Sequence, residues 1–255
     1  MTDCYTGGAR LVAILGSLIV AVTGQAQSTW RTVHQPSSWY GVFVDEPVSK
    51  RTAVVFDGQW RRMGLGDRPQ QLLLRPGVLR TLAPGVRVGG GYAYIATAPY
   101  GEAPSATPLR EHRIWQQLLL THTSGPLAMT HRYRLEQRWL APVQTNLGAG
   151  SETVGRFAYQ QRLRYMLRAQ GALPTLRVGG RRIVGFAWDE ILMPVGHADA
   201  SARLGQNRAA VGVGVPITPR QRLDIGYMNL WNPLGGARVN EINHTLTLSW
   251  IWTGR

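Results

Sequence analysis

Apolar and polar residues alternate along the chain from about residue 30 onward, and clusters of Gly, Pro, Ser and Asn interrupt the alternation roughly every ten positions. A two-residue period is that of a β-strand with two unlike faces. No long segment has the 3.6-residue period of an amphipathic helix, so we expect little helix. The pattern predicts strands at 38–45, 50–62, 70–80, 85–96, 110–122, 127–139, 156–169, 181–192, 206–215, 220–231 and 241–252.

The connections between these strands alternate in length. Short connections are predicted at 46–49, 83–84, 124–126 and 216–219, and long ones at 97–109, 140–155, 193–205 and 232–240. Short periplasmic turns and longer extracellular loops are typical of outer-membrane β-barrels. We therefore predict an all-β fold, an antiparallel up-and-down transmembrane barrel whose last strand ends on the periplasmic side.

The number of strands is constrained by parity. Eleven antiparallel strands cannot bring both chain ends to one side, and bacterial single-chain barrels normally have an even number. The segment 28–35 also alternates, and a turn at 36–37 would join it to the strand at 38–45. We therefore expect about twelve strands, with ten as the alternative if two short candidates are only loop or periplasmic extensions.

The first 26 residues have the features of a secretory signal peptide. Arg10 precedes an uncharged, mostly apolar run at 11–22, and small residues at 24 and 26 form a cleavage site. The run is too short for a transmembrane helix, which needs about 20 residues. The expected organisation is a signal peptide at 1–26 and a barrel at 27–255, in the outer membrane of a Gram-negative bacterium.

The charge of the chain is strongly positive, with 28 Lys+Arg against 14 Asp+Glu and a formal net charge of +14. Such a balance first suggests nucleic acid as a partner, but export argues against it, so no nucleic acid is expected. Lys50 is the single lysine, and the single cysteine, Cys4, precedes the cleavage site. A disulfide framework and a cysteine-based zinc site are therefore excluded.

A soluble sandwich also alternates, and it is the alternative fold. Two observations favour a membrane barrel over a sandwich. Lysine is nearly absent from the polar faces of the strands. Aromatic residues lie near strand ends, as in the interfacial girdles of membrane barrels. The girdle residues predicted are Trp139, Tyr159, Tyr165, Trp188, Trp231, Trp250 and Trp252.

Two predicted strands carry arginine on alternate positions. An arginine facing lipid near the middle of the bilayer costs about 2–4 kcal/mol, so these faces must point into the barrel. Pairing across the loop at 140–155 should bring Arg134 near Arg162 and Arg132 near Arg164, within a residue or two. The predicted lumenal and anion-binding residues are Arg132, Arg134, Glu136, Arg138, Arg162, Arg164, Arg168, Asp189 and Asp224, with Asp57 also inward.

Several short stretches resemble one bacterial family. In order they are 74–77 (LRPG), 111–117 (EHRIWQQ), 131–139 (HRYRLEQRW), 162–165 (RLRY), 189–191 (DEI), 206–208 (QNR), 226–229 (GYMN) and 243–244 (NH). Over most of residues 30–252 the chain resembles the family called domain of unknown function 2490. The arginine-rich central stretch is the most specific element. The resemblance implies a small outer-membrane barrel of Gram-negative bacteria and implies no activity.

Three functional hypotheses follow. The first is a narrow, porin-like pore whose arginine-lined lumen prefers anions. The second is a closed structural or surface-interaction barrel, since arginine–carboxylate networks also fill small barrels. The third, an outer-membrane enzyme, lacks a nucleophile or a paired-carboxylate site, so no catalytic residue is expected. The six histidines lack metal-ligand spacing, so we expect no metal and no cofactor. The partners expected are outer-membrane lipid and an anionic solute in the lumen, with the oligomeric state left open.

The run Gly89, Gly90 and Gly91 is not a phosphate-binding loop, since no helix follows it. Glycine inside a strand marks a close approach or a bend. We therefore expect tight packing at this run.

Overall fold

The computed structural model describes residues 30–102, 104–146, 151–196 and 204–254. The predicted signal peptide at 1–26 lies outside these residues. The elements are β1 (Arg31–Pro47), β2 (Thr52–Met63), β3 (Arg68–Ala83), β4 (Val86–Thr97), β5 (Leu109–Ser124), β6 (Leu127–Asn146), β7 (Ser151–Val154), β8 (Ala158–Val178), β9 (Arg181–Val195), β10 (Gln206–Pro216), β11 (Gln221–Leu234), the 3-10 turn η1 (Gly235–Ala237) and β12 (Val239–Thr253). Within the described part of the chain, none of the helical structure is long and apolar enough to cross a membrane.

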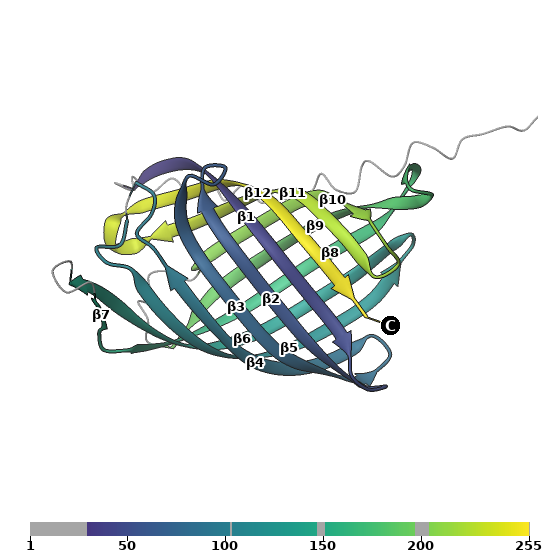
Figure 1. Ribbon diagram of the computed structural model, residues 1–255, viewed down its shortest axis with the longest axis horizontal. Coiled ribbons are helices and arrows are strands. Elements are labelled where there is room, and N and C mark those ends of the chain that lie inside the picture. The colour runs from purple at the N-terminus through teal and green to yellow at the C-terminus, as the bar shows by residue number, and fades with distance from the viewer. Residues whose placement is uncertain (1–29, 103, 147–150, 197–203, 255) are drawn as a thin grey trace, which may run out of the picture.

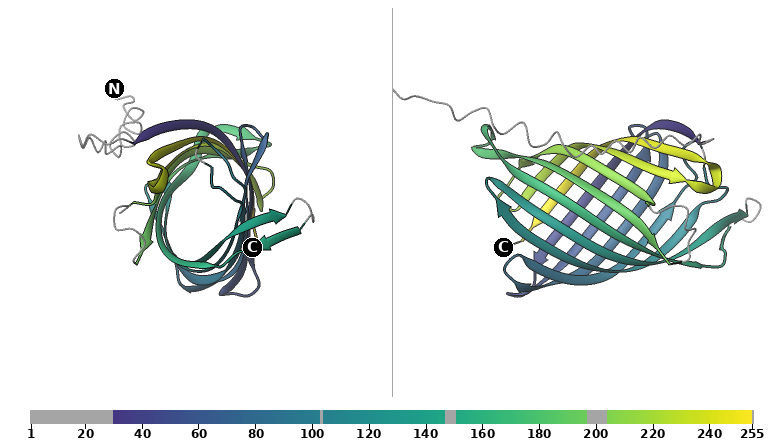
Figure 2. Two further views of the ribbon diagram at one scale, coloured as in Figure 1. Left: turned by 90° about the vertical axis from the view of Figure 1, so that its left-hand side faces the viewer. Right: turned by 180° about the vertical axis from the view of Figure 1, so that it is seen from behind.

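The strands form one closed barrel. The sheet runs in the order β5-β4-β3-β2-β1-β12-β11-β10-β9-β8-β6-β7, and β5 also pairs with β6, which closes the ring. Figure 1 shows the long, tilted strands, and Figure 2 shows the ring from one end. Eleven strands form the wall, while β7 pairs only with the end of β6 and projects beyond the wall. The predicted all-β barrel of about twelve strands is confirmed.

The first strand differs from the expectation. The turn predicted at 36–37 is absent, because β1 continues through Pro36 from Arg31 to Pro47. β2 pairs with β1 only from Ser37 onward, so a proline at 36 removes no hydrogen bond on that side. The twelfth strand is β7, which the alternation did not predict.

The pairing between the first and last strands is parallel. It extends from Arg31 opposite Val239 to Asp45 opposite Thr253. The prediction of a wholly antiparallel barrel is therefore wrong at this one seam. The physical reason is the odd number of strands in the wall, since a ring of eleven cannot alternate direction throughout.

The connections separate into two ends of the barrel. The connections at 48–51, 84–85, 125–126, 179–180 and 217–220 lie at one end, which we call the turn end. The strand ends that face each other across the other connections, from β2 to β3, β4 to β5, β6 to β8, β9 to β10 and β11 to β12, lie at the opposite end, the loop end. The predicted long connections between β4 and β5, between β6 and β8, and between β9 and β10 are confirmed. The long one predicted at 232–240 is wrong, because β11 and β12 extend and leave only 235–238, and 64–67 is a further short connection. β1 begins at the loop end and β12 finishes at the turn end.

Side chains alternate between the interior and the exterior of this wall. The interior carries the buried charges together with two small apolar clusters. The exterior carries large apolar side chains that are exposed, among them Val54, Leu74, Val78, Ile114, Tyr133, Leu163, Val211, Ile225, Tyr227 and Leu246. Most strands therefore present a polar face to the barrel interior and an apolar face outward, whereas the inner face of β4 is apolar, with Ala93 and Ile95 fully buried.

The glycine run of β4 packs against a buried tryptophan, as expected. The indole of Trp115 is 1% exposed, and its Nε1 donates to the carbonyl oxygen of Tyr92 at 3.2 Å. A Cβ added at Gly77 or Gly91 would clash with the Trp115 ring. These glycines let a large side chain lie flat against the inner wall.

Substitution at Gly77 should therefore be costly. We expect Gly77→Ala to lower the free energy of unfolding by about 1–3 kcal/mol, because the added methyl group overpacks the site. Denaturant unfolding followed by tryptophan fluorescence measures the loss. Gly235→Ala is the matched control, since nothing lies within 4 Å of a Cβ there. Equal stability of the two variants would contradict this packing.

Candidate functional site inside the barrel

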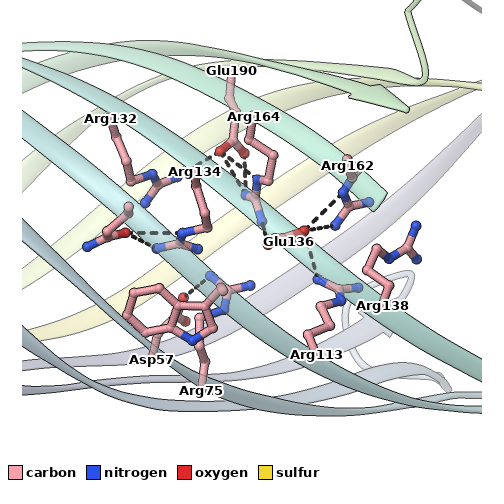
Figure 3. Close-up of polar contacts among 12 residues, drawn as sticks. Asp57, Arg75, Arg113, Arg132, Arg134, Glu136, Arg138, Arg162, Arg164 and Glu190 are labelled. Carbon is pink, nitrogen blue, oxygen red and sulfur yellow. Dashed lines mark hydrogen bonds and ion pairs between the residues drawn. The ribbon is translucent and has the colours of Figure 1, made fainter. Parts of the chain in front are cut away.

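An arginine–carboxylate network spans the interior, and its centre is the pairing of β6 with β8. In this register Arg134 lies opposite Arg164, and Glu136 lies opposite Arg162. Like charges directly opposite each other destabilise a sheet. The carboxylate of Glu136 offsets this repulsion, and Figure 3 shows it pointing among the arginines of β5 and β8.

Glu136 is fully buried and contacts three guanidinium groups. Its Oε2 accepts from Arg162 at 2.6 Å and 3.0 Å, and its Oε1 accepts from Arg164 Nη1 at 2.8 Å. Arg113 Nη1 lies 3.6 Å from Oε2. Charged hydrogen bonds of this kind are stronger than neutral ones. Glu136 is thus the carboxylate that holds β5, β6 and β8 to one charge cluster.

Glu190 on β9 is, like Glu136, a carboxylate buried among arginines, and it is 2% exposed. It accepts from Arg164 Nη2 at 2.6 Å and from Arg132 Nη2 at 2.8 Å. Arg208 Nη1 on β10 lies 3.6 Å away. Arg164 therefore bridges Glu136 and Glu190, as Figure 3 shows, and the network continues across the barrel to β10.

Three further carboxylates also pair with arginines in the interior. Glu111 accepts from Arg113 at 2.9 Å and from Arg138 at 2.5 Å. Asp57 accepts from Arg75 at 2.9 Å. Asp224 accepts from Arg222 at 2.6 Å and from Arg168 at 3.1 Å.

Two cavities lie inside the barrel, one toward each end. The loop-end cavity has a volume of about 390 Å³, and many amide side chains line it. The turn-end cavity has a volume of about 340 Å³. Five residues line both cavities, and we call them the mid-barrel layer: Trp39, Arg61, Arg75, Arg164 and Arg208.

Trp39 occupies the middle of this layer. The guanidinium of Arg61 stacks over its ring at 3.6 Å, and that of Arg208 lies 5.2 Å from the ring centroid. Arg61 also donates to the amide oxygens of Gln59 and Gln71. Stacking of cations on tryptophan is favourable, more so away from water. The layer is therefore held by ring contacts as well as by ion pairs.

The interior has more positive than negative charge. The arginines are Arg61, Arg75, Arg113, Arg132, Arg134, Arg138, Arg162, Arg164, Arg168, Arg208 and Arg222, and the carboxylates paired with them are Asp57, Glu111, Glu136, Glu190 and Asp224. Among the described residues, three buried guanidinium nitrogens have no hydrogen-bond partner: Arg75 Nε, Arg132 Nε and Arg134 Nη1. Such groups would be satisfied by an anion.

Tyr100 lies in the connection between β4 and β5 and lines the loop-end cavity. Burial away from water, together with the nearby carboxylate of Glu241, raises the pKa of Tyr100 to about 12. Its hydroxyl therefore stays protonated at the wall of this cavity.

Most of the charged residues singled out from the sequence do lie together. Arg132, Arg134, Glu136, Arg138, Arg162, Arg164, Arg168 and Asp224 all point into the barrel, as does Asp57. Asp189 is the exception. It lies on the outer face, where its Oδ2 accepts from Asn207 Nδ2 at 3.0 Å. Its neighbour Glu190 takes the inward position instead.

The residues of β9 that face inward are therefore the opposite set from the predicted one, and this also changes the position of one aromatic residue. Trp188 was expected in the outer girdle, but it packs inside against Ala210, Met228 and Leu230 and lines the turn-end cavity. The physical reason is that β9 carries an acid and a bulky apolar residue on each face, so either phase satisfies the alternation. The partners Arg132 and Arg164 select the phase that buries Glu190.

The other girdle residues lie on the outer face. Trp139 packs on Tyr159 with ring centroids 5.3 Å apart, and Trp250 lies 6.0 Å from Trp252. Tyr165 lies beside Tyr133 at 4.9 Å. Trp231 follows the outward alternation of β11.

Several interior residues were not expected from the sequence. They are Trp39, Arg61, Arg75, Glu111, Arg113, Trp115, Glu190 and Arg208. A signal for some of them exists, because Glu111, Arg113 and Trp115 alternate along β5 just as the arginines do along β6. Among the described residues, no group of three or more His, Cys, Asp or Glu side chains could hold a metal ion.

The fold and its interior define a class: a closed β-barrel of eleven tilted strands with a buried arginine–carboxylate network. Residues 37–240 match the family described as "Protein of unknown function (DUF2490)". The chain belongs to this family, as its arginine-rich stretches indicated.

One relative is an uncharacterised protein of Methylorubrum extorquens. It is 27% identical over 242 residues, which cover 92% of this chain and 95% of that protein. No solved structure matches the chain.

Proposed function

We propose that this protein is an outer-membrane β-barrel whose interior is closed by the mid-barrel layer and retains anionic ligands, rather than an open pore. The proposal includes no catalytic step. The observation that carries it is the mid-barrel layer, Trp39 and four arginines, where the two cavities meet.

The outer surface supports a membrane location. Large apolar side chains are exposed along the wall, with tyrosine and tryptophan pairs among them. A soluble monomer rarely exposes contiguous apolar patches of more than a few hundred Å². A closed ring also leaves no unpaired strand edge, which a spanning sheet requires.

The burial of the network supports closure. Glu136, Glu190, Arg113, Arg134 and Arg164 are each no more than 5% exposed, although all of them point into the barrel. Charged groups that line a water-filled channel stay in contact with water. These groups contact other interior side chains instead: Arg134 donates to Gln117, and the others form ion pairs. On the proposal, this network plugs the middle of the barrel.

The proposal predicts that the purified protein is electrically silent. In a planar lipid bilayer we expect no steady conductance above that of the protein-free membrane, because the mid-barrel layer separates the cavities. The protein should fractionate with the outer membrane. A stable ohmic conductance, or recovery in the soluble periplasmic fraction, would contradict the proposal.

An anion passage that opens under stimulus is the second candidate. The surplus of arginine over carboxylate in the interior favours it, since rings of arginine select anions. The mid-barrel layer would then act as the gate.

A further inference from the structure

We propose that the turn-end cavity is a binding site for an amphipathic anion, a single alkyl chain that carries a carboxylate or phosphate head. The inference rests on the proposed closed barrel, because the mid-barrel layer forms the inner wall of this cavity. It adds the chemical class of the ligand and the end of the barrel that holds it.

The head of the ligand is indicated by the charges around the cavity. Seven arginines line it, Arg61, Arg75, Arg132, Arg164, Arg168, Arg208 and Arg222, against three carboxylates, Asp57, Glu190 and Asp224. The side chain of Arg75 is only 3% exposed, and its Nε is buried without a partner among the described residues. The Nε of Arg132 is likewise buried without a hydrogen-bond partner among the described residues. Seven guanidinium groups against three carboxylates around one cavity favour an anionic ligand.

The tail of the ligand is indicated by the apolar part of the same wall. Phe43, Met166, Phe186, Trp188, Met228 and Ile251 line the cavity. Met side chains adapt to flexible apolar ligands, and two of them, Met166 and Met228, line this cavity. The guanidinium of Arg168 lies 4.4 Å from the Phe186 ring centroid, so charged and apolar surfaces are adjacent.

The two cavities differ in the rest of their walls. The loop-end cavity is also lined by seven arginines, with one carboxylate, Glu111. Its wall is rich in amides, including Gln70, Gln71, Gln160 and Gln206, and it contains no Phe, Ile or Met side chain. A volume of about 340 Å³ places the turn-end cavity at the lower end of the range for small-ligand pockets, about 300–1,000 Å³. The geometry therefore points to one small amphipathic anion and not to a bulky lipid.

Equilibrium dialysis of the full-length, detergent-purified protein against labelled probes tests the inference. The probes are dodecanoate, dodecyl phosphate, dodecanol, acetate and inorganic phosphate. We expect saturable binding of one dodecanoate or one dodecyl phosphate per chain, and the stronger of the two identifies the head group. Dodecanol, acetate or inorganic phosphate binding as tightly would overturn the proposal, because tail and head are both required.

Two neighbouring positions of β12 provide matched variants. Ser249 lines the cavity, whereas Leu248 lies on the outer face. Ser249→Phe should abolish saturable binding by filling the cavity, and Leu248→Phe should retain it. Retention in both variants would place the ligand elsewhere and overturn the site.

A charge variant keeps the test valid if Ser249→Phe does not fold. Arg132→Gln leaves Glu190 paired with Arg164, and we expect it to weaken dodecanoate binding about tenfold, as loss of one charged hydrogen bond would. Unchanged affinity would overturn the assigned head position. These readouts are separate from conductance, so a silent barrel that binds no probe refutes this inference and leaves the closed barrel of the proposed function standing.

Discussion

Glu136→Gln is expected to lower the free energy of unfolding by about 3–5 kcal/mol, as removal of one partner from a buried charge pair does. Glu136 is fully buried, and it is the carboxylate that pairs with Arg162. Without its charge, three guanidinium groups from β5 and β8 face one another in the interior. The neutral amide keeps the shape of the side chain, so the loss reports on charge. Denaturant unfolding followed by tryptophan fluorescence gives the measurement.

The control for Glu136→Gln is an exposed pair of the same chemistry. Glu102 accepts from Arg31 at 2.9 Å, and their side chains are 53% and 60% exposed. We expect Glu102→Gln to change the free energy of unfolding by less than about 1 kcal/mol, because water screens such pairs. If Glu136→Gln cost no more than Glu102→Gln, the network would not be what holds the barrel closed.

Trp39→Ala is expected to convert a silent barrel into a conducting one. The indole lies between the two cavities and carries Arg61 and Arg208 on its ring. Its removal should join the cavities of about 390 Å³ and 340 Å³. The arginines left at the opening should favour chloride over potassium. Planar bilayer recordings in a salt gradient give both the conductance and the selectivity.

Trp60→Ala is the matched control for this experiment. Trp60 lies on the neighbouring strand β2, and its exposed side chain points outward, where Arg62 stacks on it. We expect no conductance in this variant. A silent Trp39→Ala barrel that is folded would show that other side chains seal the middle, and a cation-selective one would contradict the arginine layer.

The alternation of residues was sufficient to predict the wall of the barrel. β6 and β8 each have one apolar face and one charged face. Such a strand fits the wall in one orientation, with its charged face toward the interior. The interior position of their arginines followed directly. The register of β6 and β8 brought the predicted neighbours together, Arg134 facing Arg164 within two residues of the expected pairing.

The phase of β9 could not be predicted in the same way. Along this strand Trp188 and Glu190 share one face, and Asp189 shares the other with Ile191. Each face thus combines an acid with a large apolar residue, and alternation alone is neutral between them. The choice is made by Arg132 and Arg164, which approach from strands β6 and β8. Information of this kind exists only in the assembled barrel.

The strand count shows a second limit. Parity led to an even number because both ends of the chain were assumed to lie on one side. The wall has eleven strands, and its ends lie on opposite sides. Nothing in the local sequence of β1 distinguishes parallel from antiparallel pairing, since the period of two is common to both.

The parallel seam also bears on how the barrel assembles. Most neighbouring strands in the wall follow one another closely in the chain, so their hairpins form from local contacts. β1 and β12 meet across a far longer stretch, as with His34 and His244, 210 residues apart. Contacts of such high sequence separation form late, and parallel pairs are slightly less stable per residue. We infer that β1 and β12 are the last neighbouring strands to pair when the barrel folds and the first to separate when it unfolds.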